Sequence, residues 1–388
     1  MSAPAPSALD LTGLRTLPAQ VWGAVRLVPL VRDAPVEDLR LGARAYDATA
    51  GLVRTGPRDA YFSYVPHGFV ATWTKDGSPA AAYGTRLSAD SDLTPTEAMP
   101  LRIHRRLARR EAKDRLRFLP LHLALEGYLA LHFNGPSIAW EEWSQRAIRN
   151  GLSPRAEQAY AGAAVDGLAE ALRVFEIHPG QCGVLLYAAD ALAAAFVVPH
   201  PDDYRALHAT LLQDLYGDLV YHYAMLMPPV PEFRADLRGA RIRSLADLRA
   251  AASRQEAEWA EFHDGTMAAG LLQEAYAWQS VYRLGRFTLS RFLPAFRPHA
   301  ENHIGEAITD ERGRIAYLKT FRLSESQIRR GHLLARLAAH DWHPADTAAD
   351  FGITEAALAL RLENAGFGNL LRQDVLDRYR RQRRVGQG

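Results

Sequence analysis

Residues 332–367 read HLLARLAAHDWHPADTAADFGITEAALALRLENAGF, and their apolar spacing predicts three short helices. Leu358 and Leu362 give the third helix an apolar stripe on one face. Gly352 lies just before that helix, and a glycine there tolerates the positive φ that a tight turn requires. Thr354 can cap the helix by accepting a backbone N–H. A helix, a glycine turn and a second helix in this order are typical of a helix-turn-helix.

The same stretch carries a more specific pattern, in which an aromatic residue precedes a Thr-Ala pair, then Gly-Ile, then a Leu-rich helix. The matching positions are Trp342, Thr347, Ala348, Gly352, Ile353, Leu358, Leu362 and Gly366. In this pattern the segment resembles the helix-turn-helix of the Fis and NtrC type. The resemblance implies that the third helix enters the major groove of DNA.

The third helix departs from that type because it holds few cationic side chains. The residues expected to face the groove are Thr354, Glu355, Arg361 and Asn364, and Glu355 would repel phosphate. Phosphate binding is expected from the tail, where six arginines outnumber two aspartates. Those arginines are Arg372, Arg378, Arg380, Arg381, Arg383 and Arg384. A second interpretation stays open, in which the helices serve packing or dimerisation.

Composition describes an ordinary globular chain. Its 388 residues, 48% apolar and 23% charged, have room for two or three domains. A net charge of +2 is too small to indicate a nucleic-acid binder, so that case rests on local clusters. Cys182 is the single cysteine, which excludes a disulfide framework and a cysteine zinc site. Without an export signal or a membrane-length apolar run, we expect a cytoplasmic protein.

Four segments are expected along the chain, and together they make the fold class α+β. Residues 1–20 are rich in Pro, Ala and Ser and predict a flexible arm, and residues 21–227 predict a mixed α+β domain. The sequence MPPVP at 227–231 can continue neither a helix nor a sheet, so it marks a boundary. Residues 232–322 are expected to be helical and to end in a β-hairpin, before the helix-turn-helix and tail at 323–388.

Periodicity places the main elements inside these segments. Strands are expected at 25–30, 183–187 and 192–198, and amphipathic helices at 245–262 and 267–292. The turn TDERGR at 309–314 lies between two apolar runs and predicts the hairpin.

A Pro-Gly-Gln-x-Gly step, running here from Pro179 to Gly183, is followed by a hairpin and then by a helix from Pro201. On this motif, residues 130–225 resemble the domain family associated with ADP-ribosylglycohydrolases and rhodanese-phosphatases. The resemblance implies an α+β domain and, by association, a link to nucleotide or ADP-ribose metabolism.

His299, Glu301, His303 and Glu306 crowd together ahead of the expected hairpin. They could hold a metal or transfer protons, although hydrogen bonding at the start of a strand explains them as well. The sequence holds no dinucleotide or phosphate-binding glycine loop, zinc-protease motif, nucleophile elbow or EF-hand loop. We therefore expect no metal, no cofactor and, more often than not, no enzyme.

These observations together predict a regulator that binds double-stranded DNA as a homodimer. Pairing is expected because one recognition helix with few polar contacts cannot discriminate DNA sites. The N-terminal domain would sense a small molecule or nucleotide, or bind a partner. Two alternatives stay open. One is an enzyme or nucleotide-binding protein of ADP-ribose or nucleotide metabolism, with C-terminal helices used for assembly. The other is a non-enzymatic scaffold of a bacterial defence or repair system.

Overall fold

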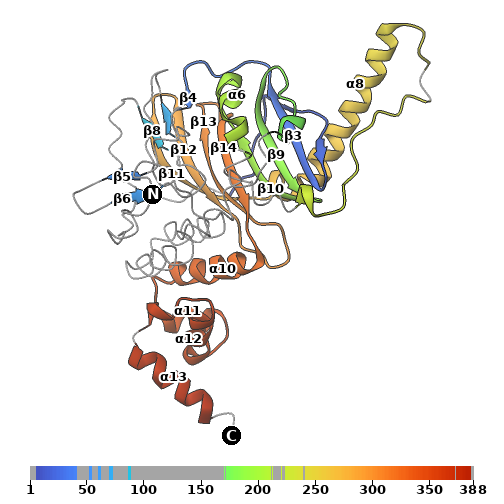
Figure 1. Ribbon diagram of the computed structural model, residues 1–388. Helices are drawn as coiled ribbons and strands as arrows, with labels where there is room; N and C mark the ends of the chain where they lie inside the picture. The colour runs from blue at the N-terminus through green and yellow to red at the C-terminus, as the bar shows by residue number, and fades with distance from the viewer. Residues whose placement is uncertain are drawn as a thin grey trace.

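In the computed structural model, one antiparallel sheet of nine strands dominates the described part of the chain (Figure 1). The structure describes residues 6–41, 52–54, 60–62, 70–72, 86–88, 170, 172–210, 212, 220, 223–238, 241–371 and 373–385. In spatial order the main strands are β1 (Leu14–Thr16), β3 (Val25–Arg32), β9 (Gln181–Ala188), β10 (Ala191–Val197), β14 (Ile315–Arg322), β13 (His303–Thr309), β12 (Phe287–Leu293) and β11 (Ala277–Leu284). The ninth, β2 (Gln20–Trp22), pairs with β3 beside this path.

The sheet joins segments that lie far apart in the sequence. β10 precedes the MPPVP run and β14 follows it, yet the two strands pair from Ala194↔Phe321 to Val197↔Leu318. The boundary expected at 227–232 therefore does not separate two sheets or two cores. The prolines end a local element, but they do not prevent a later strand from adding to an earlier sheet edge.

The first residues also belong to the sheet. Ser7 exchanges backbone hydrogen bonds with Tyr276, and the Leu9 side chain is buried in the core. The expectation of a flexible arm over 1–20 is thus wrong for the described residues 6–20. Their apolar side chains pack against the core, and β1 pairs with β3. Residues 1–5 lie outside the described residues.

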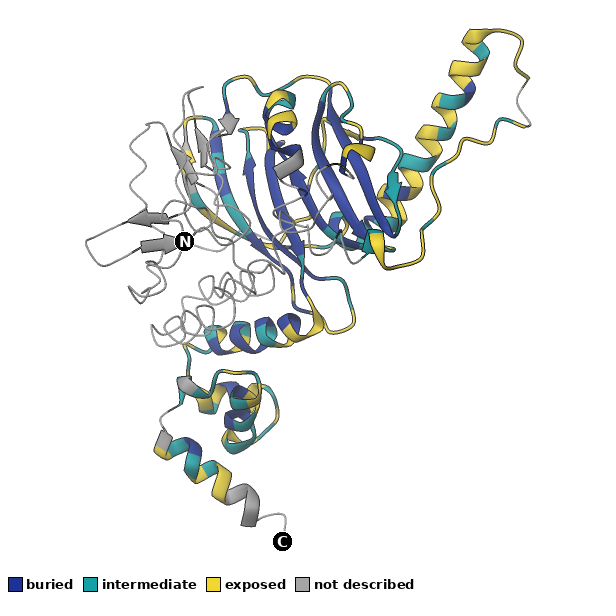
Figure 2. Cartoon of the chain, in the orientation of Figure 1, coloured by how far each residue is buried: buried dark blue, intermediate teal, exposed yellow. Residues whose placement is uncertain are grey.

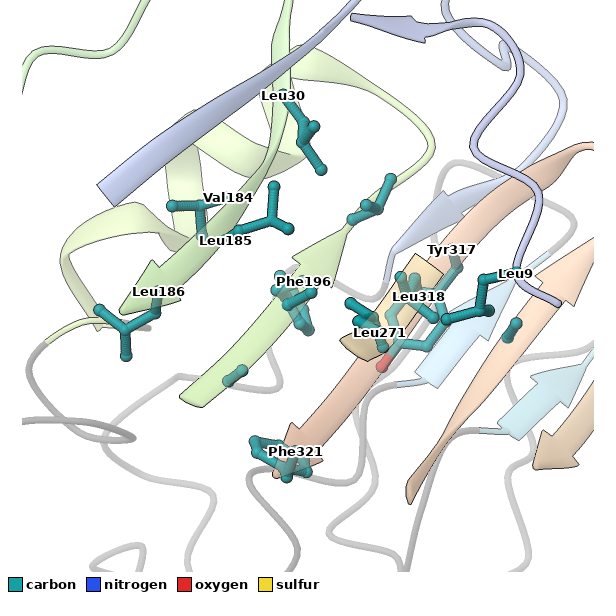
Figure 3. Packing of buried hydrophobic residues seen from close by; sticks show 14 of the residues in the cluster. Leu9, Leu30, Val184, Leu185, Leu186, Phe196, Leu271, Tyr317, Leu318 and Phe321 are labelled. Atoms are coloured by element: carbon teal, nitrogen blue, oxygen red, sulfur yellow. The ribbon is translucent and has the colours of Figure 1, made fainter. Parts of the chain in front are cut away.

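The core lies between the central strands and the helices that cover them. β3 and β9 are buried at every position, which is typical of strands covered on both faces. Helix α6 (Pro201–Thr210) packs against β9, and Figure 3 shows Leu30, Val184 and Phe196 of adjacent strands within this core. Both strands of the predicted 183–198 hairpin are confirmed as β9 and β10.

Small elements complete the N-terminal half. Strands β4 (Arg40–Leu41), β7 (Val70–Thr72) and β8 (Arg86–Ser88) form a three-stranded sheet, and β5 (Leu52–Arg54) pairs with β6 (Ala60–Phe62). A short 3-10 turn, η3 (Leu172–Val174), leads toward β9. The part of the resemblance that falls on residues 130–169 lies outside the described residues.

Helix α8 (Leu245–Phe262) confirms the helix predicted at 245–262. Ser244 caps it by accepting a hydrogen bond from the N–H of Asp247. The helix projects away from the sheet and is largely exposed (Figures 1 and 2). It continues into a π-turn, η5 (His263–Met267), and a short helix, α9 (Ala269–Leu272), which return the chain to the sheet.

The helix predicted at 267–292 is wrong, because that segment forms most of the β11–β12 hairpin. A bulge between Ser280 and Tyr282 shifts the register and breaks the alternation that would have indicated a strand. Gly285 reverses the chain with a φ of 55°. The hairpin predicted around 309–314 is confirmed as β13 and β14.

Four helices follow the sheet: α10 (Glu325–Ala339), α11 (Pro344–Asp350), α12 (Glu355–Asn364) and α13 (Gln373–Val385), with the 3-10 turn η6 (Gly368–Leu370) between the last two. Gly352 has a φ of 61°, and Thr354 accepts a hydrogen bond from the N–H of Ala357, as the sequence predicted. We call residues 325–385 the helical unit. It has its own core, made of Leu333, Leu337, Ala348, Leu358 and Leu362.

Helix α10 takes part in both cores. Ile328 lies in the core of the sheet, whereas Leu333 and Leu337 lie in the core of the helical unit. Figure 1 shows the helical unit on one side of the sheet, with α12 and α13 beyond α10. The chain is therefore α+β, as expected. No helix in the described ranges is long and apolar enough to cross a bilayer.

Candidate functional site

A pocket of about 510 Å³ opens where the α8–α9 segment meets the sheet. β3 contributes one lining residue and the β9–β10 turn another, four come from the α8–α9 segment, and two come from loops before β11 and β13. The lining residues are Arg26, Asp190, Phe262, Thr266, Met267, Gly270, Glu274 and Glu301. The volume is that of a typical small-molecule site, about 300–1,000 Å³.

Glu301, which lines this pocket, has two titratable neighbours. One of its oxygens, Oε2, lies 3.6 Å from Nε2 of His303, and the other, Oε1, lies 3.4 Å from Nη1 of Arg322. The contact with His303 lowers the pKa of Glu301, and Arg322 adds to this effect, so the carboxyl is charged at neutral pH. Burial lowers the pKa of His303, which keeps its imidazole neutral.

Gly270 in α9 leaves room for that carboxylate. A methyl group at this position would overlap Oε2 of Glu301. A larger residue at this position would displace the Glu301 side chain.

Arg26 and Asp190 form another wall of the pocket, with 3.4 Å between Nη1 and Oδ1. Only 9% of the Arg26 side chain is exposed, against 88% of Asp190. Because the arginine is buried and paired, its charge is largely offset before any ligand arrives.

Next to the pocket, hydrogen bonds link the buried Tyr187 and His263 to the exposed Asp264. The hydroxyl of Tyr187 lies 2.8 Å from Nε2 of His263, whose Nδ1 lies 2.7 Å from Oδ1 of Asp264. Thr16 donates its hydroxyl to the same carboxylate oxygen at 3.0 Å, and Trp259 stacks on the imidazole. Because Asp264 accepts from Nδ1, the favoured tautomer leaves Nε2 to accept from the phenol.

The phenol of Tyr187 stays protonated in this series of hydrogen bonds. Burial raises the pKa of Tyr187, and the negative charge of Glu301 raises it further. The hydrogen bonds of Tyr187 and Thr16 to His263 and Asp264 therefore hold η5 in place. This turn carries the pocket residues Thr266 and Met267.

His299, Glu301, His303 and Glu306 are close in the sequence, but the structure does not bring all four side chains together. His299 pairs with exposed Glu325 at 3.1 Å, and Glu306 lies on the opposite face of β13 from His303. Glu306 is fully buried between Arg291, at 3.1 Å, and Lys319, at 3.4 Å. Only Glu301 and His303 meet. Within the described ranges no cluster of three or more His, Cys, Asp or Glu side chains could hold a metal.

The residues predicted to contact the DNA groove are all exposed on or beside α12. Thr354 precedes the helix, and Glu355, Arg361 and Asn364 lie on it. The carboxylate of Glu355 accepts a hydrogen bond from the hydroxyl of Tyr379 at 3.1 Å, so α13 lies against one side of α12. Arg361 lies 5.6 Å from the ring centre of Phe351.

The tail arginines lie on α13, apart from Arg372, which falls outside the described residues. Arg378 and Arg381 are exposed, whereas Arg380 contacts Glu363 and also Asp377, the latter at 3.0 Å. Arg383 and Arg384 belong to the helix, but their side chains are not described. The charge of Arg380, one of the predicted phosphate contacts, is therefore offset by these two carboxylates.

Sequence reasoning missed the residues behind the pocket. Tyr187 and His263 lie 76 positions apart and show no recognisable spacing, and Arg26 looks like an ordinary strand residue. A weak signal existed in the His263-Asp264 pair directly after an amphipathic helix. Nothing in the sequence indicates that β9 lies beneath it.

The fold and pocket define an α+β protein built on a large antiparallel sheet. A family model described as ARPP-2 matches residues 9–285, and the chain therefore belongs to the ARPP-2 family. All pocket residues except Glu301 lie within the matched range. No curated protein and no solved structure matches the chain.

This family match corrects both resemblances drawn from the sequence. The match begins at residue 9 and names ARPP-2, in place of the glycohydrolase-associated and rhodanese-associated family expected over 130–225. It ends before the helical unit, and the comparisons supply no support for a Fis or NtrC relationship. The local motifs are short turn and packing patterns, which recur in unrelated folds.

Proposed function

We propose that the chain binds double-stranded DNA through α12 and α13, and that its sheet is the part that senses a small molecule or a partner. The observation that carries this proposal is the exposure of Arg361 and Asn364 on a helix whose core is separate from that of the sheet.

Helix geometry supports α12 as the groove-facing element. Thr354 and Arg361 are seven positions apart, about two turns, so they lie on the same side of the helix axis. The ring of Phe351 beneath Arg361 orients the guanidinium by a cation–π contact while leaving it exposed. A guanidinium held in this way can present two donors to a guanine edge or a phosphate.

The pairings within the helical unit narrow the set of contacts. Glu355 and Arg380 are engaged with Tyr379 and Glu363, so neither is assigned to DNA. Arg378 and Arg381 remain as exposed cations on α13 for the phosphate backbone. With so few side chains, one unit gives little affinity, and site recognition requires two copies on one duplex.

Fluorescence anisotropy with a labelled random duplex at low salt tests this proposal. Replacing both Arg378 and Arg381 by Ala should weaken binding at least about tenfold and reduce the salt dependence by about one unit per arginine. The control R312A removes one positive charge from an exposed turn of the sheet and should bind as the wild type does.

Two results contradict DNA binding by this surface. One is a wild-type chain that gives no anisotropy change at low salt. The other is an equal loss in R312A and in the double variant, since that would indicate a general charge effect.

A further inference from the structure

We propose that α8 pairs antiparallel with α8 of a second copy of this chain, so that the two projecting helices make a homodimer. Helix α8 and the helical unit lie on different sides of the sheet in Figure 1, and the inference does not rest on DNA binding. Three features of α8 support it: the small extent to which its own chain covers it, an apolar stripe, and the separation of its charges.

The residues before α8 cover only part of the helix. The N–H of Asp236 donates to Oε1 of Gln255 at 3.3 Å, and the ring of Phe233 packs edge-on against Trp259 with 6.0 Å between the ring centres. Ala251 is the one residue of α8 that is buried. Most of the stability of a protein helix comes from packing of its apolar face, and α8 obtains little of that packing from its own chain (Figure 2).

Apolar side chains recur along α8 at the spacing of a two-helix interface. From Leu245 onward the steps are three, four, three, four and three residues, an alternation that keeps one stripe facing a partner helix. Large exposed side chains mark both ends, since Leu245 is 62%, Leu248 37% and Phe262 55% exposed. The three residues between these ends are half-buried and keep part of their surface for a partner. The apolar stripe consists of Leu245, Leu248, Ala252, Gln255, Trp259 and Phe262.

The charges of α8 are separated along its length. Residues 241–254 hold four arginines and one aspartate, a charge of +3, whereas residues 255–262 hold three glutamates, a charge of −3. This order opposes the helix macrodipole, which favours acidic residues at the start of a helix and basic residues at its end. Within the described part of the chain, Arg249, Arg254, Glu256 and Glu261 have no ion-pair partner. Their charges are therefore available to a second molecule.

A second copy that runs in the opposite direction matches the apolar stripe. In the register that centres the stripe on itself, Leu245 meets Phe262 of the partner subunit, and Leu248 meets Trp259 of the partner subunit. The small side chain of Ala252 then lies near the centre, where the two helices approach each other. Two-fold symmetry repeats every contact.

The same register matches the charges. It places Arg249 beside Glu256 of the partner subunit, and the symmetry produces this pair twice. A parallel partner would set arginine against arginine and glutamate against glutamate, which costs free energy. Because 18 helical residues extend about 27 Å, the antiparallel pair also keeps the two sheets at opposite ends.

Sedimentation velocity without DNA tests the inference. The wild-type chain should pass from monomer to dimer as its concentration rises to about 100 μM, the range of a micromolar dissociation constant. Leu248→Glu puts a charge into the apolar stripe and should raise the dissociation constant at least about tenfold. Val174→Glu makes the same kind of change at an exposed apolar side chain outside α8 and should dimerise as the wild type does. Thermal unfolding checks that each variant is folded.

Charge reversal then tests the direction of pairing. Arg249→Glu and Glu256→Arg should each weaken the dimer about fivefold, because each leaves like charges beside each other. R249E/E256R exchanges the two charges and should restore wild-type association. Arg312→Glu reverses a charge on an exposed turn of the sheet and should have no effect. In a parallel pair each residue would face its own copy, so the single reversals would change nothing.

Four outcomes overturn the inference. They are a wild-type chain that stays monomeric at about 100 μM, wild-type association in folded L248E, wild-type association in R249E, and an R249E/E256R variant as weak as the single reversals. The double variant that lacks Arg378 and Arg381 should still dimerise, because α13 is not part of this interface. A failure of dimerisation is therefore distinct from a failure of the DNA-binding proposal.

Discussion

His208 on α6 is a buried imidazole whose protonation the fold opposes. Its Nδ1 lies 3.0 Å from the hydroxyl of Tyr204, and burial lowers the pKa of His208 to about 4. Within the described residues, its Nε2 has no hydrogen-bond partner that could hold a second proton. The folded state therefore binds this proton less readily than the unfolded state, whose pKa is about 6.5.

A pH dependence of stability follows from that difference. The contribution of His208 is fully present above pH about 6.5 and is lost as pH falls toward 4, by about 3 kcal/mol in total. Urea unfolding of the wild type and H208Q across this range should show a smaller loss in the variant. H299N, which removes an exposed histidine at a φ that Asn tolerates, should behave as the wild type does. An identical pH profile in H208Q would contradict the assignment.

The residues of the pocket illustrate what local sequence contains. Glu301 and His303 are two positions apart at the start of a strand, so their proximity could be predicted. Tyr187 and His263 meet only because η5 docks over β9, a contact that depends on packing of the whole sheet. The pairing of Glu355 with Tyr379 likewise depends on how α13 docks, and it could not be predicted from α12 alone.

At the scale of elements, the chain follows its local patterns where these are regular. Helices α8, α10 and α12 and the β9–β10 hairpin have clean periodicity or clear caps, and all were predictable. The β11–β12 hairpin was not, because its bulge shifts the alternation by one residue. Pairing of β10 with β14 was not predictable either, since more than a hundred residues separate the two strands and no local signal encodes that contact.

Two glycines of the helical unit differ in what they require. Gly331 in α10 faces the ring of Phe296, which a methyl group would overlap, whereas a methyl group on Gly352 would meet open space. G331A should therefore cost about 1–3 kcal/mol through overpacking, and G352A about 1 kcal/mol through its positive φ alone. Thermal unfolding measures both. A larger loss of stability in G352A than in G331A would contradict the close packing of α10 against Phe296.

At the scale of the whole molecule, α10 links two cores that would otherwise be separate. Ile328→Ala should destabilise both the sheet and the helical unit, by about 2–4 kcal/mol, because the helix lies in both. Leu362→Ala should lower protection from hydrogen exchange mainly in α11 and α12. Hydrogen-exchange mass spectrometry separates the two patterns. Loss of protection confined to the sheet in I328A would show that the cores are not coupled through α10.

The position of the last three strands has a practical consequence for anyone who expresses part of this protein. The ARPP-2 match ends at residue 285, yet β12, β13 and β14 fill the space between β10 and β11. A fragment cut at that residue would leave two unpaired strand edges with apolar faces in solvent, which is the template for aggregation. A soluble fragment should therefore include β12 to β14 and also the helical unit to residue 385, because Leu333 and Leu337 of α10 are buried against that unit.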